Sequence, residues 1–148
     1  MRYLEDFSAE QVISFGSVVV TEADVVGFAR QFDPQVFHLE PEAPLTREMG
    51  GLLASGWHTT AIFMRLAVEA YLADSAILMS PGVDQVRWLH PVRPGDEISG
   101  EAVVYEVRPS RSRPDRGILS TKVRLWNQHR EDVLTLTAHA FVRRAYRG

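Results

Sequence analysis

The longest apolar stretch of the 148-residue chain is GWHTTAIFMRLAVEAYLA, from Gly56 to Ala73. Apolar residues fall on most sides of it at helical spacing, which predicts a helix that is buried on several faces. His58, Arg65 and Glu69 make the stretch too polar for a transmembrane span of about 20 apolar residues. We therefore expect the central helix of a globular core, with Arg65 and Glu69 on its one solvated edge.

The segments downstream of this helix alternate between apolar and polar residues, as strands do. After the break at Pro81-Gly82, strands are expected at 83–88 and 98–107, the second with Val103, Tyr105 and Val107 on one face. Two more strands are expected where apolar residues alternate over 119–125 and 134–142. Turn-rich segments separate these four strands.

The segments before the central helix contain one strand and one further helix. The strand is expected at 15–20, and Thr21-Glu22-Ala23-Asp24 then has the form of a capping box. The helix that follows ends at Asp33-Pro34, because a residue before proline disfavours the helical region. A loop with one short helical turn comes next. Helices followed by a meander of strands favour an α+β fold in which an antiparallel sheet wraps around the central helix. Pairing with a second copy of the chain would protect its edge strands.

The composition is that of one soluble globular domain covering residues 1–148. The chain is 45% hydrophobic and 24% charged, and its net charge of -3 gives no argument for nucleic acid or an acidic membrane as a partner. It has no cysteine, which excludes disulfides, thiolate catalysis and Cys-ligated metals and fits the cytoplasm. A signal peptide is not expected from its first residues. No metal is expected either, because paired histidines at helical spacing and carboxylate clusters are missing from the sequence.

Asp33, His38 and Gly56 are the candidate catalytic residues. A carboxylate and an imidazole five positions apart can share one water molecule, and a glycine at a helix start can offer its N–H to a developing oxyanion. A free histidine titrates near pH 6.5, whereas a free aspartate titrates near 3.9 and is a poor base unless burial raises its pKa. Each residue also has a structural alternative: a turn aspartate, a core or surface histidine, and a close-packing glycine.

Three segments carry a resemblance to a known family. FARQFDPQVFHLEPEA at 28–43 resembles the hydratase motif of the MaoC-like dehydratases, a family that includes (R)-specific enoyl-CoA hydratases. In that motif an Asp is followed by Asn or Gln two positions on and by His five positions on. GLLASGWHT at 51–59 and VDQVRWLHPVRPGD at 83–96 are similar to the second and third motifs of the family. Val36 stands where many members have Pro, and Ser55 stands where many have His.

The resemblance implies a hot-dog fold, an antiparallel sheet curled around a long helix that dimerises into a continuous sheet. It also implies reversible hydration of a 2-enoyl thioester to the (R)-3-hydroxyacyl form, with coenzyme A or an acyl carrier as part of the substrate and no other cofactor. Asp33 and His38 would activate the water and manage the α-proton, and the Gly56 N–H would bind the thioester oxygen. Which of Asp33 and His38 is the base stays open. The alternatives are a hot-dog acyl-CoA thioesterase and a non-catalytic acyl-thioester or subunit-binding module.

Further residues are candidates for binding the substrate. Those in or near the three motifs are Gln35, Ser55, Trp57, His58 and Arg87. Two more, Arg111 and Arg113, lie in the loop 108–116, which carries four arginines and one acidic residue. The arginines are candidates because their planar forks suit the phosphates of coenzyme A, with Arg93 as a further choice. The alternative for the loop is an ordinary solvated hairpin.

Overall fold

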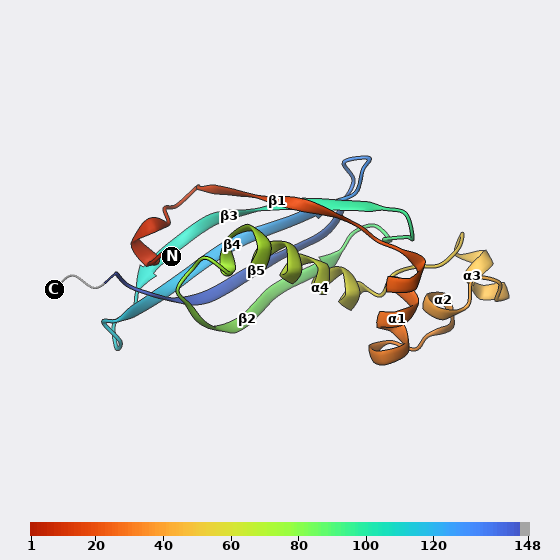
Figure 1. The fold of residues 1–148 in the computed structure, drawn as a ribbon, viewed down its shortest axis with the longest axis horizontal. Helices are drawn as coiled ribbons and strands as arrows, with labels where there is room; N and C mark the ends of the chain where they lie inside the picture. Colours follow the sequence, from red (N-terminus) through yellow and green to blue (C-terminus); the bar gives the residue numbers. More distant parts are fainter. Residues whose placement is uncertain (146–148) are drawn as a thin grey trace.

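A computed structural model describes residues 1–145 and shows a five-stranded sheet curled around one helix (Figure 1). The strand order is β1-β3-β4-β5-β2, and every neighbouring pair is antiparallel. The strands are β1 (Val12–Val19), β2 (Ile77–Trp88), β3 (Glu97–Pro109), β4 (Arg116–Trp126) and β5 (Asp132–Arg143). The helices are η1 (Leu4–Asp6), α1 (Glu22–Phe32), α2 (Val36–Leu39), α3 (Pro44–Glu48), α4 (Gly56–Ala67) and η2 (Val68–Leu72), a π-helical turn that continues α4. The predicted α+β class and wrapped helix are confirmed.

The core lies between α4 and the concave face of the sheet. Leu66 of α4, Leu125 of β4 and Leu134 of β5 are all fully buried there, and burying one such side chain stabilises the fold by roughly 1.5–3 kcal/mol. The exposed edge of α4 is wider than the sequence predicted. Besides the 3.1 Å ion pair between Arg65 and Glu69, it carries three exposed apolar side chains, those of Trp57, Met64 and Val68.

The inward faces of the strands follow the predicted alternation, with one exception. Leu119, Thr121, Val123 and Leu125 of β4 are buried, as expected. On β3, however, the buried residues are Ile98, Ala102 and Val104, on the opposite face from Val103. Both faces of this segment are apolar, so alternation alone does not select the inner one. A register irregularity between Val104 and Glu106 also interrupts the alternation.

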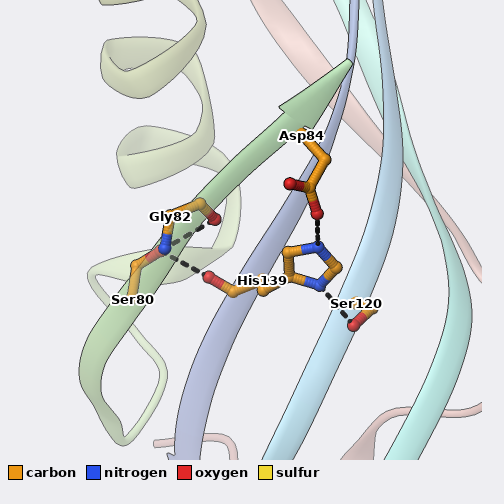
Figure 2. Close-up of polar contacts among 5 residues, drawn as sticks. All are labelled: Ser80, Gly82, Asp84, Ser120 and His139. Carbon is orange, nitrogen blue, oxygen red and sulfur yellow. Dashed lines mark hydrogen bonds and ion pairs between the residues drawn. The ribbon is translucent and has the colours of Figure 1, made fainter. Parts of the chain in front are cut away.

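Strand β2 begins at Ile77 and runs through Pro81-Gly82, where the sequence indicated a break. Proline is tolerated because β2 is an edge strand. The missing N–H of Pro81 is offset by the Ser80 hydroxyl, which donates to the His139 carbonyl at 2.6 Å and accepts from the Gly82 N–H at 3.1 Å (Figure 2). The imidazole of His139 also contacts Asp84 of β2, with 2.8 Å between Nε2 and Oδ2. These contacts hold the irregular edge strand on β5.

The segment between β1 and α4 forms the cap over one end of α4 (Figure 1). The capping box is confirmed: Asp24 N–H donates to Thr21 Oγ1 at 3.1 Å and Thr21 N–H donates to Asp24 Oδ2 at 3.3 Å. Helix α1 ends before Asp33, as expected. Two short helices, α2 and α3, then follow where one helical turn was predicted. Helix α3 has a proline at its start, where the backbone N–H that proline lacks would have no hydrogen-bond partner within the helix. Within residues 1–145 no helix is long and apolar enough to span a membrane.

Candidate active site

Asp33 and His38 meet at the junction of α1 and α2. Asp33 caps α1, and its N–H donates to the Ala29 carbonyl at 2.9 Å. Its Oδ2 lies 3.2 Å from Nε2 of His38, which is on α2. Only 7% of the His38 side chain and 18% of the Asp33 side chain are exposed. The five-residue spacing therefore places a partly exposed carboxylate in contact with a buried imidazole.

The second nitrogen of the His38 ring is fixed by the backbone of Leu53. Nδ1 lies 2.6 Å from the Leu53 carbonyl oxygen, and because a carbonyl only accepts, Nδ1 carries a proton. Nε2 is then the nitrogen that exchanges protons with its surroundings. The Leu53 N–H in turn donates to the Phe37 carbonyl at 3.0 Å. These two bonds join α2 to the segment that leads into α4.

The carboxylate of Asp33 is held ionised by its neighbours. Burial raises its pKa, but hydrogen bonding with Ser55 and Gln35 and the interaction with the His38 imidazole outweigh burial, so the pKa lies below its ordinary value of 3.8. The Gln35 amide donates to Oδ1 at 2.7 Å. From the sequence, Asp33 is expected to be a good base only if burial raises its pKa, and this condition is not met. At neutral pH Asp33 is a carboxylate with both of its oxygens in contact with partners.

Gly56 is the first residue of α4, directly after the N-cap Ser55. Ser55 Oγ accepts from the Trp57 N–H at 3.2 Å, whereas no acceptor for the Gly56 N–H is found among residues 1–145. A Cβ on Gly56 would lie 2.3 Å from Cδ2 of Trp88, so only glycine fits against that ring. The N–H at this helix start therefore points to no acceptor within the described part of the chain, and the N-cap residue Ser55 helps to lower the pKa of the nearby Asp33 carboxyl.

The predicted substrate-binding residues separate into four groups, of which Arg111 and Arg113 are the last. Gln35 donates to Asp33, and Ser55 is the N-cap of α4 beside Gly56. Trp57 is 60% exposed and packs edge-on against Trp88, with ring centroids 5.2 Å apart, while Arg87 is exposed on β2. His58 instead lies between α4 and α1, stacked on Phe28.

Arg111 and Arg113 do not join this site within one chain. They lie in the β3–β4 hairpin, at the end of the sheet opposite to α1, α2 and α3 (Figure 1). The 13 residues of β3 span roughly 40 Å at about 3.3 Å per residue, so the length of a strand separates the hairpin from Asp33. That these two arginines clamp the phosphates at the nucleotide end of coenzyme A stays a prediction, and a loop's sequence does not reveal at which end of the sheet it lies.

Arg93 has a role that sequence reasoning missed. Its guanidinium donates to the carbonyls of Gly51 at 3.1 Å and Met49 at 2.6 Å, and its own N–H donates to Asp96 Oδ2 at 2.8 Å. Gly51 has a φ of 118°, which favours glycine, and such a turn leaves carbonyls without helical partners. In the sequence, the Met49-Gly50-Gly51 break was the signal that this turn has carbonyls in need of a hydrogen-bond donor. Arg93 fastens the third motif to the turn that precedes Ser55 and Gly56.

The assembled groups suit proton transfer beside a polarised carbonyl. A water molecule can be shared by the carboxylate of Asp33 and Nε2 of His38, and a substrate oxygen can accept from the N–H at the positive end of α4. No set of three or more histidine, aspartate or glutamate side chains within residues 1–145 is placed to hold a metal ion.

An antiparallel sheet curled around one helix, with an acid–imidazole pair beside the start of that helix, defines a hot-dog domain. Residues 6–126 match the family model described as MaoC like domain, and the chain belongs to this family. The family expected from the three motifs is thereby confirmed.

Relatives and solved structures agree with this assignment. The chain is 30% identical over 125 residues to the uncharacterized protein YdeM of Bacillus subtilis (strain 168), covering 84% of this chain and 87% of that one. It is 40% identical to a MaoC-like dehydratase from Rhodospirillum rubrum, with a TM-score of 0.88 and coverage of 99% and 100%. The (R)-hydratase PhaJ1 from Pseudomonas aeruginosa shares the fold, with a TM-score of 0.78 at 20% identity over 97% of this chain and 86% of that one.

Proposed function

We propose that the protein is a hydratase/dehydratase that adds water reversibly to a 2-enoyl thioester, with coenzyme A or an acyl carrier as the thiol. The observation that carries the proposal is the 3.2 Å contact between Asp33 and His38, which the Leu53 carbonyl orients from behind. Membership of a family with (R)-hydratases of the same fold supports it. The polar side chains of Gln35 and Ser55 complete the site around the carboxylate.

In the proposed reaction His38 is the base and Asp33 balances its charge. Nε2 accepts one proton from the water as the water oxygen attacks Cβ, and the imidazolium so formed lies against the carboxylate of Asp33. Asp33 is the weaker base because its pKa is lowered. Returning a proton to Cα restores the pair, so the reaction adds H and OH with no net change in the protein. General acid–base catalysis of this kind contributes about 10²–10⁴ in rate.

The negative charge of the transition state develops on the thioester oxygen. The Gly56 N–H, at the first position of a 12-residue helix, is the proposed donor to this oxyanion. The helix dipole adds a partial positive charge at the same place. One donor of this type is worth about 10²–10³ in kcat.

An assay with crotonyl-CoA separates this function from its rivals. Loss of the enoyl absorbance without release of free thiol is expected. Thiol release would instead establish the thioesterase alternative, for which a carboxylate beside a helix start is also suited. A non-catalytic binding module would produce neither signal, but it would require Asp33 and His38 to point apart or to be blocked. Their contact favours the enzyme.

A second copy of the chain is the proposed partner at the edge strand β2. This edge exposes Met79, Val83 and Trp88, beside the exposed apolar side chains of α4, and an uncovered apolar edge strand invites pairing. Antiparallel pairing of β2 with β2 of the copy would extend the sheet and cover this surface.

Charging this edge is expected to dissociate the dimer. For Met79→Lys, sedimentation equilibrium should give the monomer mass of 16.7 kDa, because a lysine on the pairing face would be buried without a partner. The matched control is Val12→Lys on the opposite edge strand, where Val12 is 55% exposed; it should leave the dimer intact. A dimer that survives Met79→Lys and is lost in Val12→Lys would move the interface to β1.

A further inference from the structure

His58 connects the two helices that carry the proposed catalytic groups. Its ring stacks on that of Phe28, with centroids 4.8 Å apart and planes within 8° of parallel. Phe28 belongs to α1, which ends at Asp33, and His58 belongs to the first turn of α4, which starts at Gly56. The stack therefore sets how the end of α1 lies relative to the start of α4.

We propose that His58 is a positioning residue whose neutral ring, stacked on Phe28, keeps Asp33 in position relative to Gly56, and whose protonation breaks that stack. The roles of Asp33 and Gly56 in this statement rest on the proposed function. The stack itself does not, and it is a property of the fold that is measurable without substrate.

The surroundings of His58 favour its neutral form. The residue is 9% exposed, and its Nδ1 is fully buried with no hydrogen-bond partner among residues 1–145. A protonated ring would carry an N–H on both nitrogens, and leaving a charged donor unpaired in the interior is costly. Burial accordingly lowers the pKa of His58, while the charge of Asp24 opposes this by raising it.

A groove beside the ring offers the protonated form another position. It has a volume of about 440 Å³ and lies between α1, α4 and the end of β1. Asp24 of α1 and Arg65 of α4 are its charged groups, and β1 with the residue that follows it contributes only valines 18–20. Arg65 is paired with Glu69, so the carboxylate of Asp24, one helical turn before Phe28 on α1, is the group of this groove that would attract a protonated His58. A ring drawn toward Asp24 would leave the face of Phe28, and this displacement is the proposed change of state.

The direction of the pH dependence follows from the lowered pKa. The unfolded chain, with a histidine pKa of 6.5, binds a proton more readily than the folded one. The stability that His58 contributes is thus complete above about pH 6.5 and is lost as the pH falls from there through the folded pKa. Asp33, with its pKa below 3.8, stays ionised between about pH 5 and about pH 8, and the other histidines are common to wild type and His58→Phe, so a comparison of the two isolates His58.

Three variants test the proposal by urea unfolding and by crotonyl-CoA hydration between about pH 5 and about pH 8. His58→Phe keeps an aromatic ring on Phe28 but cannot titrate. Its kcat/KM relative to wild type should rise about tenfold for each pH unit below the His58 midpoint, where wild type is increasingly protonated. Phe28→Leu removes the stack and should lower kcat about tenfold at neutral pH, because small misplacements of catalytic groups are costly. His129→Asn, which removes an exposed histidine, should follow wild type throughout.

The two readouts separate this proposal from the proposed function. If wild type hydrates no enoyl thioester, the proposed function fails, and the unfolding profiles still decide whether His58 titrates as a buried neutral group. If His58→Phe loses stability in acid as steeply as wild type does, or if its kcat/KM keeps the same acid limb, His58 is not the positioning residue.

Discussion

Asp33→Asn is expected to lower kcat for enoyl-thioester hydration by about 10²–10⁴ while leaving the fold intact. The amide has the shape of the carboxylate, so the contacts with Gln35 and Ser55 have a replacement partner, but the negative charge that faces Nε2 of His38 at 3.2 Å is lost. The imidazolium formed when His38 accepts a proton from water then has no counter-charge in a nearly buried site. The measurement is kcat and KM with crotonyl-CoA, with circular dichroism as the check on folding.

The matched control for this variant is Asp74→Asn. The Asp74 side chain is 72% exposed and contacts the N-terminal amine at 3.1 Å, at the far end of the fold from His38, so its hydration rate should equal that of wild type. Urea unfolding provides a second test. Because the pKa of Asp33 is lowered, its ionised form contributes stability above about pH 3.8 that is lost as the pH falls further, and Asp33→Asn should lack this acid loss. Hydration that survives Asp33→Asn at the wild-type rate would remove Asp33 from the mechanism.

The sequence was sufficient for the parts of the site that depend on local spacing. Asp33 precedes a proline that ends α1, and five residues later His38 lies on the next helical turn, so their contact follows from the chain between them. The buried helix from Gly56 follows in the same way from its apolar pattern. Both features arise from neighbours in the chain, and local patterns record such neighbours well.

The parts that sequence could not supply depend on residues far apart in the chain. The Leu53 carbonyl fixes the His38 tautomer through a backbone atom, which any residue type at position 53 could supply. The Arg93 side chain holds the turn at Gly51 from 42 residues away, and the local pattern does not indicate such a contact. The position of Arg111 at the far end of the sheet is a matter of topology. Pro81 led to the prediction of a break in the chain. Proline is tolerated within β2 because β2 is an edge strand, and the residue pattern does not show which strands lie at an edge.

Gly56→Ala is expected to be the most damaging single methyl addition in the site. The new Cβ would lie 2.3–2.6 Å from three atoms of the Trp88 ring. Alanine gains about 1 kcal/mol over glycine in helix propensity, but overpacking costs typically 1–3 kcal/mol. Overpacking wins here because Trp88 is held by a 3.1 Å hydrogen bond from its Nε1 to Thr60 and by its edge contact with Trp57.

Relief of this clash must come from the start of α4 or from the Trp88 ring. Either movement alters the position of the Gly56 N–H, so kcat should fall by about 10²–10³, the value of one oxyanion donor, together with a lower melting temperature. Gly27→Ala is the control: it lies within α1 with no atom within 4 Å of its added Cβ, and it should gain stability from propensity alone. If Gly56→Ala resembles Gly27→Ala in both melting temperature and kcat, the added methyl group is accommodated without displacing the backbone amide, and the predicted coupling between the Trp88 ring and the position of the Gly56 N–H is wrong.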